Sequence, residues 1–385
     1  MSTQSQQPLD GLRVLDLGQI YNGAYAGFLL AQAGADVVKV EPPVGDNLRN
    51  RPLAHGAWYP FVALNVGKRS VCLDLKTEVG RERFLELVTV ADVVLENYSP
   101  GVMDRLGVGY EAMRAANPRL IYASSSGYGN DSRYRDRPAM DLTVQAMVGV
   151  TSVTGYPDQP PVKAGVAVAD FAAGVHMYGG IVTALLRRER TGEGGTVEVA
   201  MFDAAFPPLL SSLAVALGTT DENPERTGNR HGGRGEAPYN VYATSDGYVA
   251  IICVTDVQWR ALADVIGGEP LAADARFSTR AVRVENIDAL DLAVGTWAAA
   301  RRRDEVIEAL LARGIPAAPV RDLREVVEDP DARERGLLRE VVDPTHGPIR
   351  VFGSAIRYDG EPAPDPAPAP ALGEHTEHVL RDWSR

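Results

Sequence analysis

Asp170 is the residue whose type and position point most directly to chemistry, because it is the one acid in the apolar run of residues 166–174. Apolar side chains recur at helical spacing over residues 172–190, and Gly192 follows, which predicts a helix that begins close to Asp170. The free N–H groups and the dipole at a helix N-terminus favour an ionised carboxylate. We expect Asp170 to be anionic at neutral pH and able to attack an electrophilic carbon, although aspartate is also a common helix N-cap.

Basic and glycine-rich residues could contribute to binding. Lys68, Arg69, Lys76 and Arg105 could together hold the phosphates of a nucleotide-like cofactor through charge-assisted hydrogen bonds, and each alone is explained equally well as ordinary surface. Residues 228–235 (GNRHGGRG) form either a linker between domains or a mobile lid, since glycine permits the backbone conformations that a moving loop requires.

Several common site motifs are missing from the sequence. No G-x-S-x-G nucleophile elbow and no P-loop occur, and residues 18–23 (GQIYNG) lack the order of a dinucleotide fingerprint. Residues 124–127 (SSSG) are either a strand end that cradles a ligand or a plain turn. His375 and His378 lie three residues apart without a third ligand nearby, so we expect no metal site. A serine hydrolase and a nicotinamide-dependent enzyme are therefore disfavoured.

The first half of the chain alternates short apolar strands with helical segments, a pattern typical of a parallel sheet flanked by helices. In open sheets of this kind the ligand lies at the carboxyl ends of the strands, so the loops at residues 18–23, 97–101 and 126–129 should lie together. The expected strands are residues 12–17, 36–41, 70–75, 92–96, 120–125 and 196–201, and the expected helices include residues 24–33 and 79–88.

A smaller α+β domain is expected in the second half. Two alternating runs, residues 239–243 and 248–254, flank a turn and predict an antiparallel hairpin, and helices are expected at residues 257–266 and 304–313. Proline-rich residues 365–370 should be extended, before a last helix that begins at Glu374 or Thr376. We divide the chain into a large domain of residues 1–200, a linker of residues 201–224, a small domain of residues 225–325, and a linker with a C-terminal return to the large domain, residues 326–385.

The overall composition limits the partners. The chain has 385 residues, 45% of them hydrophobic, and a formal net charge of -12, which disfavours nucleic-acid binding because that requires a basic surface. Cys72 and Cys253 are expected to be free thiols, which favours a reducing, cytoplasmic setting. Residues 1–7 carry no targeting pattern, and we expect no segment of bilayer length and no membrane association.

Motifs along nearly the whole chain resemble the class III CoA-transferases, in the same order from about residue 8 to residue 380. The runs that carry the resemblance are residues 8–16 (PLDGLRVLD), 34–41 (GADVVKVE), 68–76 (KRSVCLDLK), 91–97 (ADVVLEN), 100–101 (PG), 104–107 (DRLG), the segment around Asp170, 314–319 (GIPAAP) and 372–375 (LGEH).

This resemblance implies a fold, a reaction and partners. The fold is an interlocked homodimer, in which the N-terminal half and the returning tail build a large Rossmann-like domain with a small α+β domain between them. The reaction begins when Asp170 attacks an acyl-CoA thioester to give an anhydride, continues through an aspartyl-CoA thioester, and ends with CoA on an acceptor acid. The partners are an acyl-CoA and a small carboxylic acid, with CoA as a cosubstrate and no tightly bound cofactor.

Site residues also follow from the resemblance. The lid over the anhydride would be Gly232, Gly233 and Gly235, followed by Glu236 where formyl-CoA transferase has Gln. Pro42 stands where formyl-CoA transferase has Arg, so the phosphate contacts must differ in part. The CoA contacts would be Tyr21, Asn22, Leu73, Lys76, Asn97, Tyr98 and Arg105.

The racemase relatives of this family provide an alternative function. They require two bases on opposite faces of the substrate's α-carbon, but two of the matching positions here are Met140, ahead of Asp141, and Thr255. Methionine cannot carry a proton, so 1,1-proton transfer would need a substitute such as His176. Transfer of CoA is therefore favoured over 2-methylacyl-CoA racemisation, and a CoA-binding protein without catalysis is the remaining alternative.

Overall fold

The computed structural model describes residues 7–51, 56, 58–218 and 225–383. The chain divides into two compact units, the first formed by Met1–Val148, Val166–Ala205 and Val327–Arg385, and the second by Gly149–Gly165 and Phe206–Val326. These boundaries differ from the expected ones at two places. Gly149–Gly165 belongs to the second unit, and much of the expected linker is helical, because α9 (Met201–Ala205) and α10 (Leu210–Gly218) occupy it.

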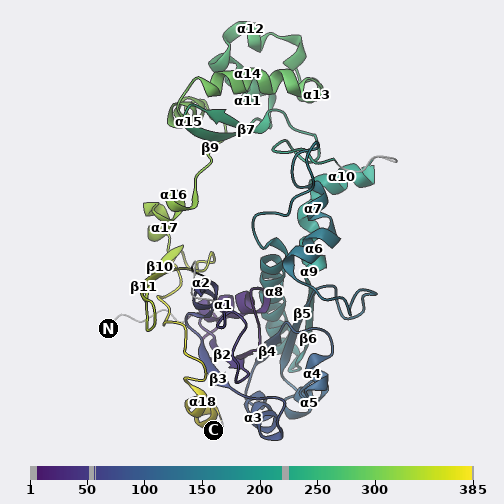
Figure 1. Cartoon of the computed structure of the whole chain (residues 1–385), viewed down its shortest axis with the longest axis vertical. Helices are drawn as coiled ribbons and strands as arrows, with labels where there is room; N and C mark the ends of the chain where they lie inside the picture. Colours follow the sequence, from purple (N-terminus) through teal and green to yellow (C-terminus); the bar gives the residue numbers. More distant parts are fainter. Residues whose placement is uncertain (1–6, 52–55, 57, 219–224, 384–385) are drawn as a thin grey trace. The chain divides into compact units, whose positions relative to one another are not determined.

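The first unit is built on a six-stranded sheet, which confirms the predicted α/β class (Figure 1). The strand order is β3-β2-β1-β4-β5-β6, and every neighbouring pair is parallel. The order reverses between β1 and β4, which is the position where open α/β sheets bind their ligands. The strands are β1 (Arg13–Asp16), β2 (Asp36–Glu41), β3 (Arg69–Cys72), β4 (Val93–Glu96), β5 (Ile121–Ser126) and β6 (Gly195–Ala200).

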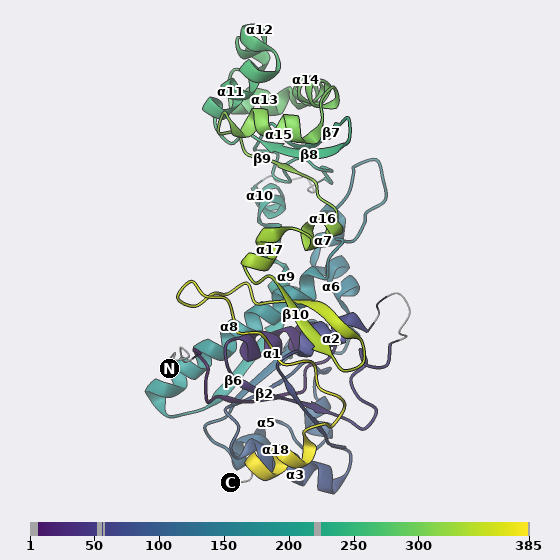
Figure 2. The ribbon, with the colours of Figure 1, turned by 90° about the vertical axis from the view of Figure 1, so that its left-hand side faces the viewer.

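Helices cover both faces of this sheet. Successive strand residues such as Val14 and Leu15 face opposite sides of the sheet, and they are buried in different hydrophobic clusters. One face packs against α1 (Asn22–Gln32) and α8 (Val168–Thr191), and the other against α3 (Glu78–Val88), α5 (Tyr110–Ala116) and α18 (Thr376–Trp383), as Figure 2 also shows. The unit also contains α2 (Tyr59–Asn65), α4 (Val102–Arg105), α6 (Asp141–Val148), α17 (Pro330–Glu334) and the antiparallel pair β10 (Leu338–Asp343) and β11 (Gly347–Phe352).

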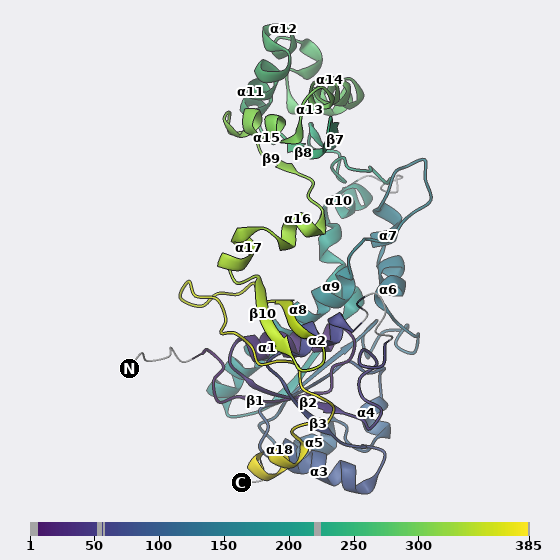
Figure 3. The same ribbon diagram turned by 60° about the vertical axis from the view of Figure 1, so that its left-hand side comes forward.

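The C-terminal segment returns to the edge of the sheet at β3. Ser70 N–H donates to His375 Nδ1 over 3.2 Å, and Cys72 N–H donates to Thr376 Oγ1 over 3.0 Å. The ring of Trp383 is buried, and its Nε1 donates to Asp36 Oδ2. These contacts attach the yellow segment of Figure 3 to the strand beside it and begin α18 at one of the two expected residues, Thr376.

The second unit contains a three-stranded antiparallel sheet in the order β7-β8-β9, with the predicted hairpin formed by β7 (Tyr239–Thr244) and β8 (Gly247–Ile252). Its core includes Trp259, Leu290 and Val294. The other elements are α7 (Val150–Val153), a 3-10 turn η2 (Pro207–Leu209), α11 (Asp256–Ile266), α12 (Gly268–Ala272), η3 (Ala275–Phe277), α13 (Arg280–Glu285), α14 (Ile287–Ala299), α15 (Arg303–Leu311), β9 (Ala317–Pro319) and α16 (Leu323–Val327), which ends at the unit boundary.

Two helical segments, Val168–Thr191 and Met201–Gly218, have the length and apolar composition of a membrane span. The expectation that no segment reaches this length was wrong. The first of them, α8, places Met177, Ile181 and Leu185 in the core of its own unit. A helix in the core of a folded unit can have the same length and apolar composition as a membrane-spanning helix. These two segments are therefore only weak evidence that the protein crosses a membrane.

Candidate active site

Asp170 lies in the first turn of α8, at its third residue, and is not the helix N-cap. The N-cap is Ala167, which offers no side-chain cap. Instead, Asp141 at the start of α6 accepts the N–H groups of Ala169 over 2.9 Å and of Asp170 over 3.3 Å through its Oδ1. The capping reading of Asp170 was therefore wrong, because a second aspartate from another helix already performs that role and leaves the Asp170 carboxylate available.

The Asp170 side chain lines a cavity of about 120 Å³ in the first unit. The cavity walls come from the loops that follow β1, β4 and β5, which confirms that these loops lie together. The residues from these loops and from the adjoining ends of α1 and β5 that line the cavity include Gln19, Ile20, Asn22, Asn97, Tyr98, Ser125 and Ser126.

Side-chain amides join the loops around this cavity. Asn97 accepts the backbone N–H of Gln19 over 2.7 Å with its Oδ1 and donates its Nδ2 to the Gln19 carbonyl over 3.0 Å. Asn22 Nδ2 donates to Ser125 Oγ over 2.8 Å. A Cβ on Gly23 would lie only 2.9 Å from the Cα of Gly18, so this close approach requires glycine. The loops are therefore fixed relative to each other before any ligand binds.

The surroundings of Asp170 raise the pKa of its carboxyl group from 3.8 to about 7. The main cause is burial, and the negative charge of Asp141 adds to it. None of the described residues donates a hydrogen bond to this carboxylate that would offset the burial. Burial therefore opposes the ionisation of Asp170 that the helix N-terminus favours, so the carboxyl group is ionised only in part near neutral pH. When Asp170 does ionise, its carboxylate is poorly solvated and thus suited to nucleophilic attack.

Replacing Asp141 with asparagine is expected to move the acidic midpoint of the kcat/KM profile below the wild-type value of about 7, by roughly one pH unit or less. The substitution removes the charge that raises the pKa of Asp170, while the asparagine oxygen still accepts the Ala169 N–H. The profile should be measured with saturating acceptor acid and limiting acyl-CoA. An unchanged midpoint would show that Asp141 does not set the ionisation of the reacting group.

The residues predicted to contact CoA fall into two groups. Asn22, Asn97 and Tyr98 line the Asp170 cavity, and the ring of Tyr21 stacks on Phe171 at a centroid distance of 5.9 Å. The other group does not line that cavity: Leu73 is buried in the hydrophobic core, Lys76 is exposed after β3, and Arg105 ends α4.

Two of the candidate phosphate-binding cations are engaged elsewhere. Lys68 is buried, and its Nζ donates to Asp16 Oδ2 over 2.7 Å and to the Ala24 carbonyl over 2.9 Å. Arg69 forms an ion pair with Asp36. The suggestion that Lys68 holds phosphates was therefore wrong, because its ion pair is fully buried, whereas the ion pair of Arg69 is partly exposed.

A second cavity, of about 240 Å³, shares Tyr98, Ser125 and Arg135 with the first one. Glu96 lines it at the end of β4 and accepts the Tyr98 N–H over 2.6 Å and the Tyr122 hydroxyl over 2.8 Å. Burial outweighs these hydrogen bonds and raises the pKa of Glu96 to about 7. Nothing in the sequence singled out Glu96, because a local pattern gives no measure of the burial of a carboxylate at a strand end.

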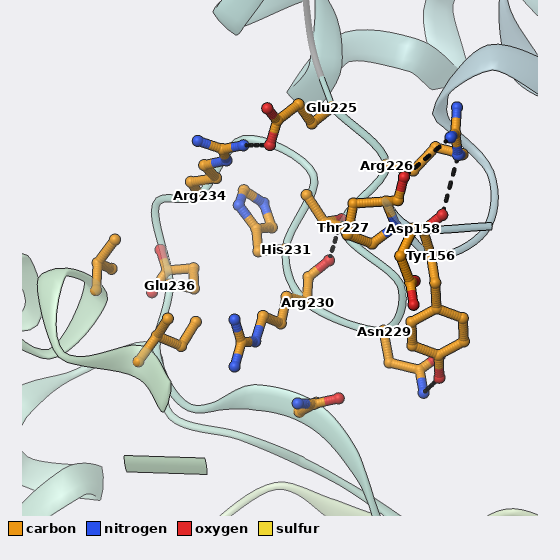
Figure 4. Close-up of a pocket in the computed structure, with 14 residues that line it drawn as sticks. Tyr156, Asp158, Glu225, Arg226, Thr227, Asn229, Arg230, His231, Arg234 and Glu236 are labelled. Atoms are coloured by element: carbon orange, nitrogen blue, oxygen red, sulfur yellow. Dashed lines mark hydrogen bonds and ion pairs between the residues drawn. The ribbon is translucent and has the colours of Figure 1, made fainter. Parts of the chain in front are cut away.

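The glycine-rich segment lines a larger cavity, of about 570 Å³, inside the second unit (Figure 4). Glu236 belongs to its wall and pairs with Arg280 over 3.2 Å, and the cavity also includes Arg234, which pairs with Glu225. Gly232, Gly233 and Gly235 belong to the same loop, in which the Gly235 N–H donates to His231 Nδ1 over 3.2 Å. Since Asp170 lies in the other unit, the lid role of this loop remains a prediction.

The family described as CoA-transferase family III matches residues 9–376. The chain belongs to this family. It is therefore an enzyme that transfers CoA from an acyl-CoA to a carboxylic acid, as the resemblance in its motifs implied.

Similar proteins extend over the same length as this CoA-transferase. The acetyl-CoA:oxalate CoA-transferase of Acetobacter aceti is 39% identical over 381 residues, which cover 98% of this chain and 96% of that protein. The succinyl-CoA:mesaconate CoA-transferase of Haloarcula hispanica is 38% identical over 386 residues, 97% of this chain and 95% of that protein. A CAIB/BAIF family protein from Brucella suis has a crystal structure with 36% identity and a TM-score of 0.85, covering 98% of this chain and all of that one.

The positions that a racemase would need are occupied differently in this transferase. Met140 lines the Asp170 cavity beside Asp141, and Thr255 is the N-cap of α11 in the second unit, where its side chain accepts the Gln258 N–H. His176 Nδ1 donates to the Ala172 carbonyl over 2.8 Å on α8 and is not among the residues that line the cavity. Met140 therefore supplies no base, and His176 is not placed to act as its substitute in the described cavity.

Proposed function

We propose that this enzyme transfers CoA through covalent intermediates on Asp170. An ionised Asp170 oxygen attacks the thioester carbonyl carbon of the donor, a C–O bond forms, and the C–S bond breaks to release CoA thiolate. The thiolate attacks the aspartyl carbonyl carbon and displaces the donor acid as its carboxylate, which leaves aspartyl-CoA. The acceptor carboxylate then displaces the thiolate to form a second anhydride, and the thiolate attacks the acceptor carbonyl to give the new acyl-CoA and regenerate Asp170.

The observation that carries this proposal is the position of Asp170 in the cavity formed by the loops at the reversal of strand order. The same cavity is lined by Asn22, whose Oδ1 is buried without a hydrogen-bond partner among the described residues, so it can accept an N–H from the pantetheine arm of CoA. The raised pKa of Asp170 supports the same role, because a desolvated carboxylate attacks more readily than a solvated one.

The assembly belongs to the proposal as well. We expect the interlocked homodimer that the family resemblance implies, with the loop at Gly232, Gly233, Gly235 and Glu236 as the lid that keeps water from the anhydride. Exposed apolar side chains on α10 support the expectation of a partner chain, since Leu210 is 74% exposed and Leu217 is 84% exposed. The free thiols of Cys72 and Cys253 support a cytoplasmic location.

An isotope experiment tests the covalent route. The enzyme is incubated with acetyl-CoA or succinyl-CoA and with acceptor acids whose carboxylates carry ¹⁸O, and new acyl-CoA products are separated by mass. In the proposed route, the bridging oxygen of the second anhydride comes from the acceptor and stays on Asp170, so the peptide that contains Asp170 should gain one ¹⁸O in a single turnover and up to two after many turnovers. Formation of acyl-CoA product without label on that peptide would rule out the anhydride, and no CoA exchange with any acid would refute transfer itself.

A further inference from the structure

Ile20 has a backbone conformation that its residue type disfavours. Its φ angle is 59°, in the left-handed region, where a β-branched side chain crowds the backbone. Among the residues that the structure describes, Arg234 and Asp359 are the other non-glycine residues with positive φ, and neither of them is β-branched. Ile20 also lines the Asp170 cavity. A strained backbone persists only where surrounding contacts hold it, and such positions cluster at functional sites.

Asn97 supplies contacts that hold this conformation. Its Oδ1 accepts the Gln19 N–H over 2.7 Å, and its Nδ2 donates to the Gln19 carbonyl over 3.0 Å. That carbonyl belongs to the planar peptide group that joins Gln19 to Ile20. The φ angle of Ile20 describes the rotation between this peptide group and the rest of Ile20, so the hydrogen bond from Asn97 restricts that angle.

The chain is fixed on both sides of Ile20. The Gly18 N–H donates to Asp16 Oδ1, and the Gly18 carbonyl accepts from Lys39 Nζ, each over 2.7 Å. On the other side, α1 begins at Asn22 and sets the direction of the chain. Ile20 therefore joins two segments that are each held by other contacts, and its φ angle takes up the change in direction between them.

This change in direction places Asn22, the first residue of α1, in the cavity. Asn22 is 1% exposed and lines the Asp170 cavity. Its Nδ2 donates to Ser125 Oγ over 2.8 Å, whereas its buried Oδ1 has no hydrogen-bond partner among the described residues. A buried acceptor of this kind costs free energy until a ligand supplies a donor. The position of this acceptor depends on the turn at Ile20.

We propose that Asn97 is a positioning residue for CoA transfer, which holds Ile20 in the left-handed conformation and so places Asn22 before the acyl-CoA binds. This inference deepens the proposed function, because it rests on the Asp170 cavity as the site of the acyl-CoA. Without Asn97 the loop has the binding conformation for only part of the time, and the apparent affinity falls by that fraction. Glycine adopts positive φ as readily as negative φ, so glycine at position 20 removes the need for this restraint.

A double-mutant cycle between positions 97 and 20 tests the proposal. Calorimetric titration with free CoA measures binding, and kcat/KM with limiting acetyl-CoA measures transfer. Asn97→Ala should weaken CoA binding by about five- to thirty-fold, and Ile20→Gly in the same protein should recover most of this loss. Ile20→Ala removes the same side chain but keeps a Cβ, so it should recover little.

Three results would overturn the proposal. Equal recovery from Ile20→Gly and Ile20→Ala would mean that the bulk of the isoleucine matters and its φ angle does not. No recovery from either would mean that Asn97 acts by direct contact with CoA, because such a contact does not depend on the residue at position 20. A CoA affinity that Asn97→Ala leaves unchanged would remove the restraint itself.

Asn117 provides a matched control in the same unit. Its Nδ2 donates to the Val88 and Ala91 carbonyls, and its Oδ1 accepts the Arg119 N–H. It therefore joins backbone segments as Asn97 does, but it lines neither the Asp170 cavity nor the cavity beside it. Asn117→Ala should lower the melting temperature without changing CoA affinity. An equal loss of affinity in Asn117→Ala and Asn97→Ala would show that binding only reports the stability of the unit.

Thermal unfolding tests the strain without any change at Asn97. Ile20→Gly and Ile20→Ala lose the same contacts, and only glycine relieves the left-handed conformation, so Ile20→Gly should melt at the higher temperature. A melting temperature of Ile20→Gly equal to or below that of Ile20→Ala would show that Ile20 is not strained, and would overturn the proposal.

Repeating the CoA titrations in Asp170→Asn protein separates this inference from the proposed function, because binding of free CoA needs no nucleophile. The same pattern of affinities would support the positioning role even if Asp170→Asn retained transfer activity, which would refute Asp170 as the nucleophile. Affinities that do not depend on positions 97 and 20, in an Asp170→Asn protein without activity, would reject the positioning role and leave the covalent route intact.

Discussion

Replacing Asp170 with asparagine is expected to lower kcat for CoA transfer by roughly 10⁴-fold or more, because the nucleophile that carries both covalent intermediates is lost. The reason is chemical rather than structural. The α8 N-terminus is capped by Asp141 and not by Asp170, so the helix keeps its cap in the variant. Steady-state transfer with a donor and acceptor identified in the wild type measures the loss.

The stability of the same variant distinguishes a nucleophile from a structural residue. The pKa of Asp170 is raised in the folded protein from 3.8 to about 7, so the folded state binds more protons than the unfolded state between these values. Its contribution to the free energy of unfolding therefore declines as the pH rises through this window, by up to roughly 4 kcal/mol once both states are ionised. Asparagine cannot ionise and avoids this cost.

Thermal unfolding of wild type and Asp170→Asn at about pH 8 and about pH 5 measures the effect. The variant should melt at the same or a higher temperature at the higher pH, and the difference between the two proteins should shrink at the lower pH. An inactive variant that also unfolds early would favour a structural role for Asp170. An active variant would exclude it as the nucleophile.

The sheet of the first unit was predictable from the sequence because its signals are local. Each strand is a short apolar run, and both β2 (Asp36–Glu41) and the start of α18 at Thr376 agree with the expected positions. The prediction that the loops around Asp170 lie together followed from the parallel order of the strands alone. These features depend on residues that are neighbours in the chain.

Other features depend on residues that meet only after folding. The cap of α8 comes from Asp141, 28 residues earlier, and the same residue raises the pKa of Asp170. A sequence pattern gives no measure of burial, so it predicted an ionised Asp170 from the helix N-terminus alone. The assignment of Gly149–Gly165 to the second unit likewise depends on contacts between segments that are far apart in sequence.

The burial of Lys68 illustrates the same limit. In the sequence Lys68 could be a phosphate-binding or an ordinary surface cation, but its side chain is fully buried against an equally buried Asp16, 52 residues away. Asp16 Oδ1 also accepts the Gly18 N–H over 2.7 Å, and Lys39 donates to the Gly18 carbonyl over the same distance. The ion pair therefore supports the loop after β1, from which Gln19 and Asn22 reach the Asp170 cavity.

Replacing Lys68 with methionine is expected to lower the free energy of unfolding of the first unit by about 3 to 5 kcal/mol, because it leaves the Asp16 carboxylate buried without its ion-pair partner. Hydrogen exchange read by mass spectrometry measures this loss separately in the two units. Protection should fall in peptides from β1 and α1, while peptides from α11 and α14 of the second unit serve as the internal reference.

A second substitution shows whether the lost stability comes from the uncompensated charge. In the double variant Lys68→Met with Asp16→Asn, the asparagine oxygen can still accept the Gly18 N–H, and neither charge of the Lys68–Asp16 pair remains. The double variant should therefore recover a large part of the protection that the single variant loses. Equal loss in both would mean that Lys68 acts through its packing and its bond to the Ala24 carbonyl, and that the loop beneath the Asp170 cavity does not depend on the ion pair.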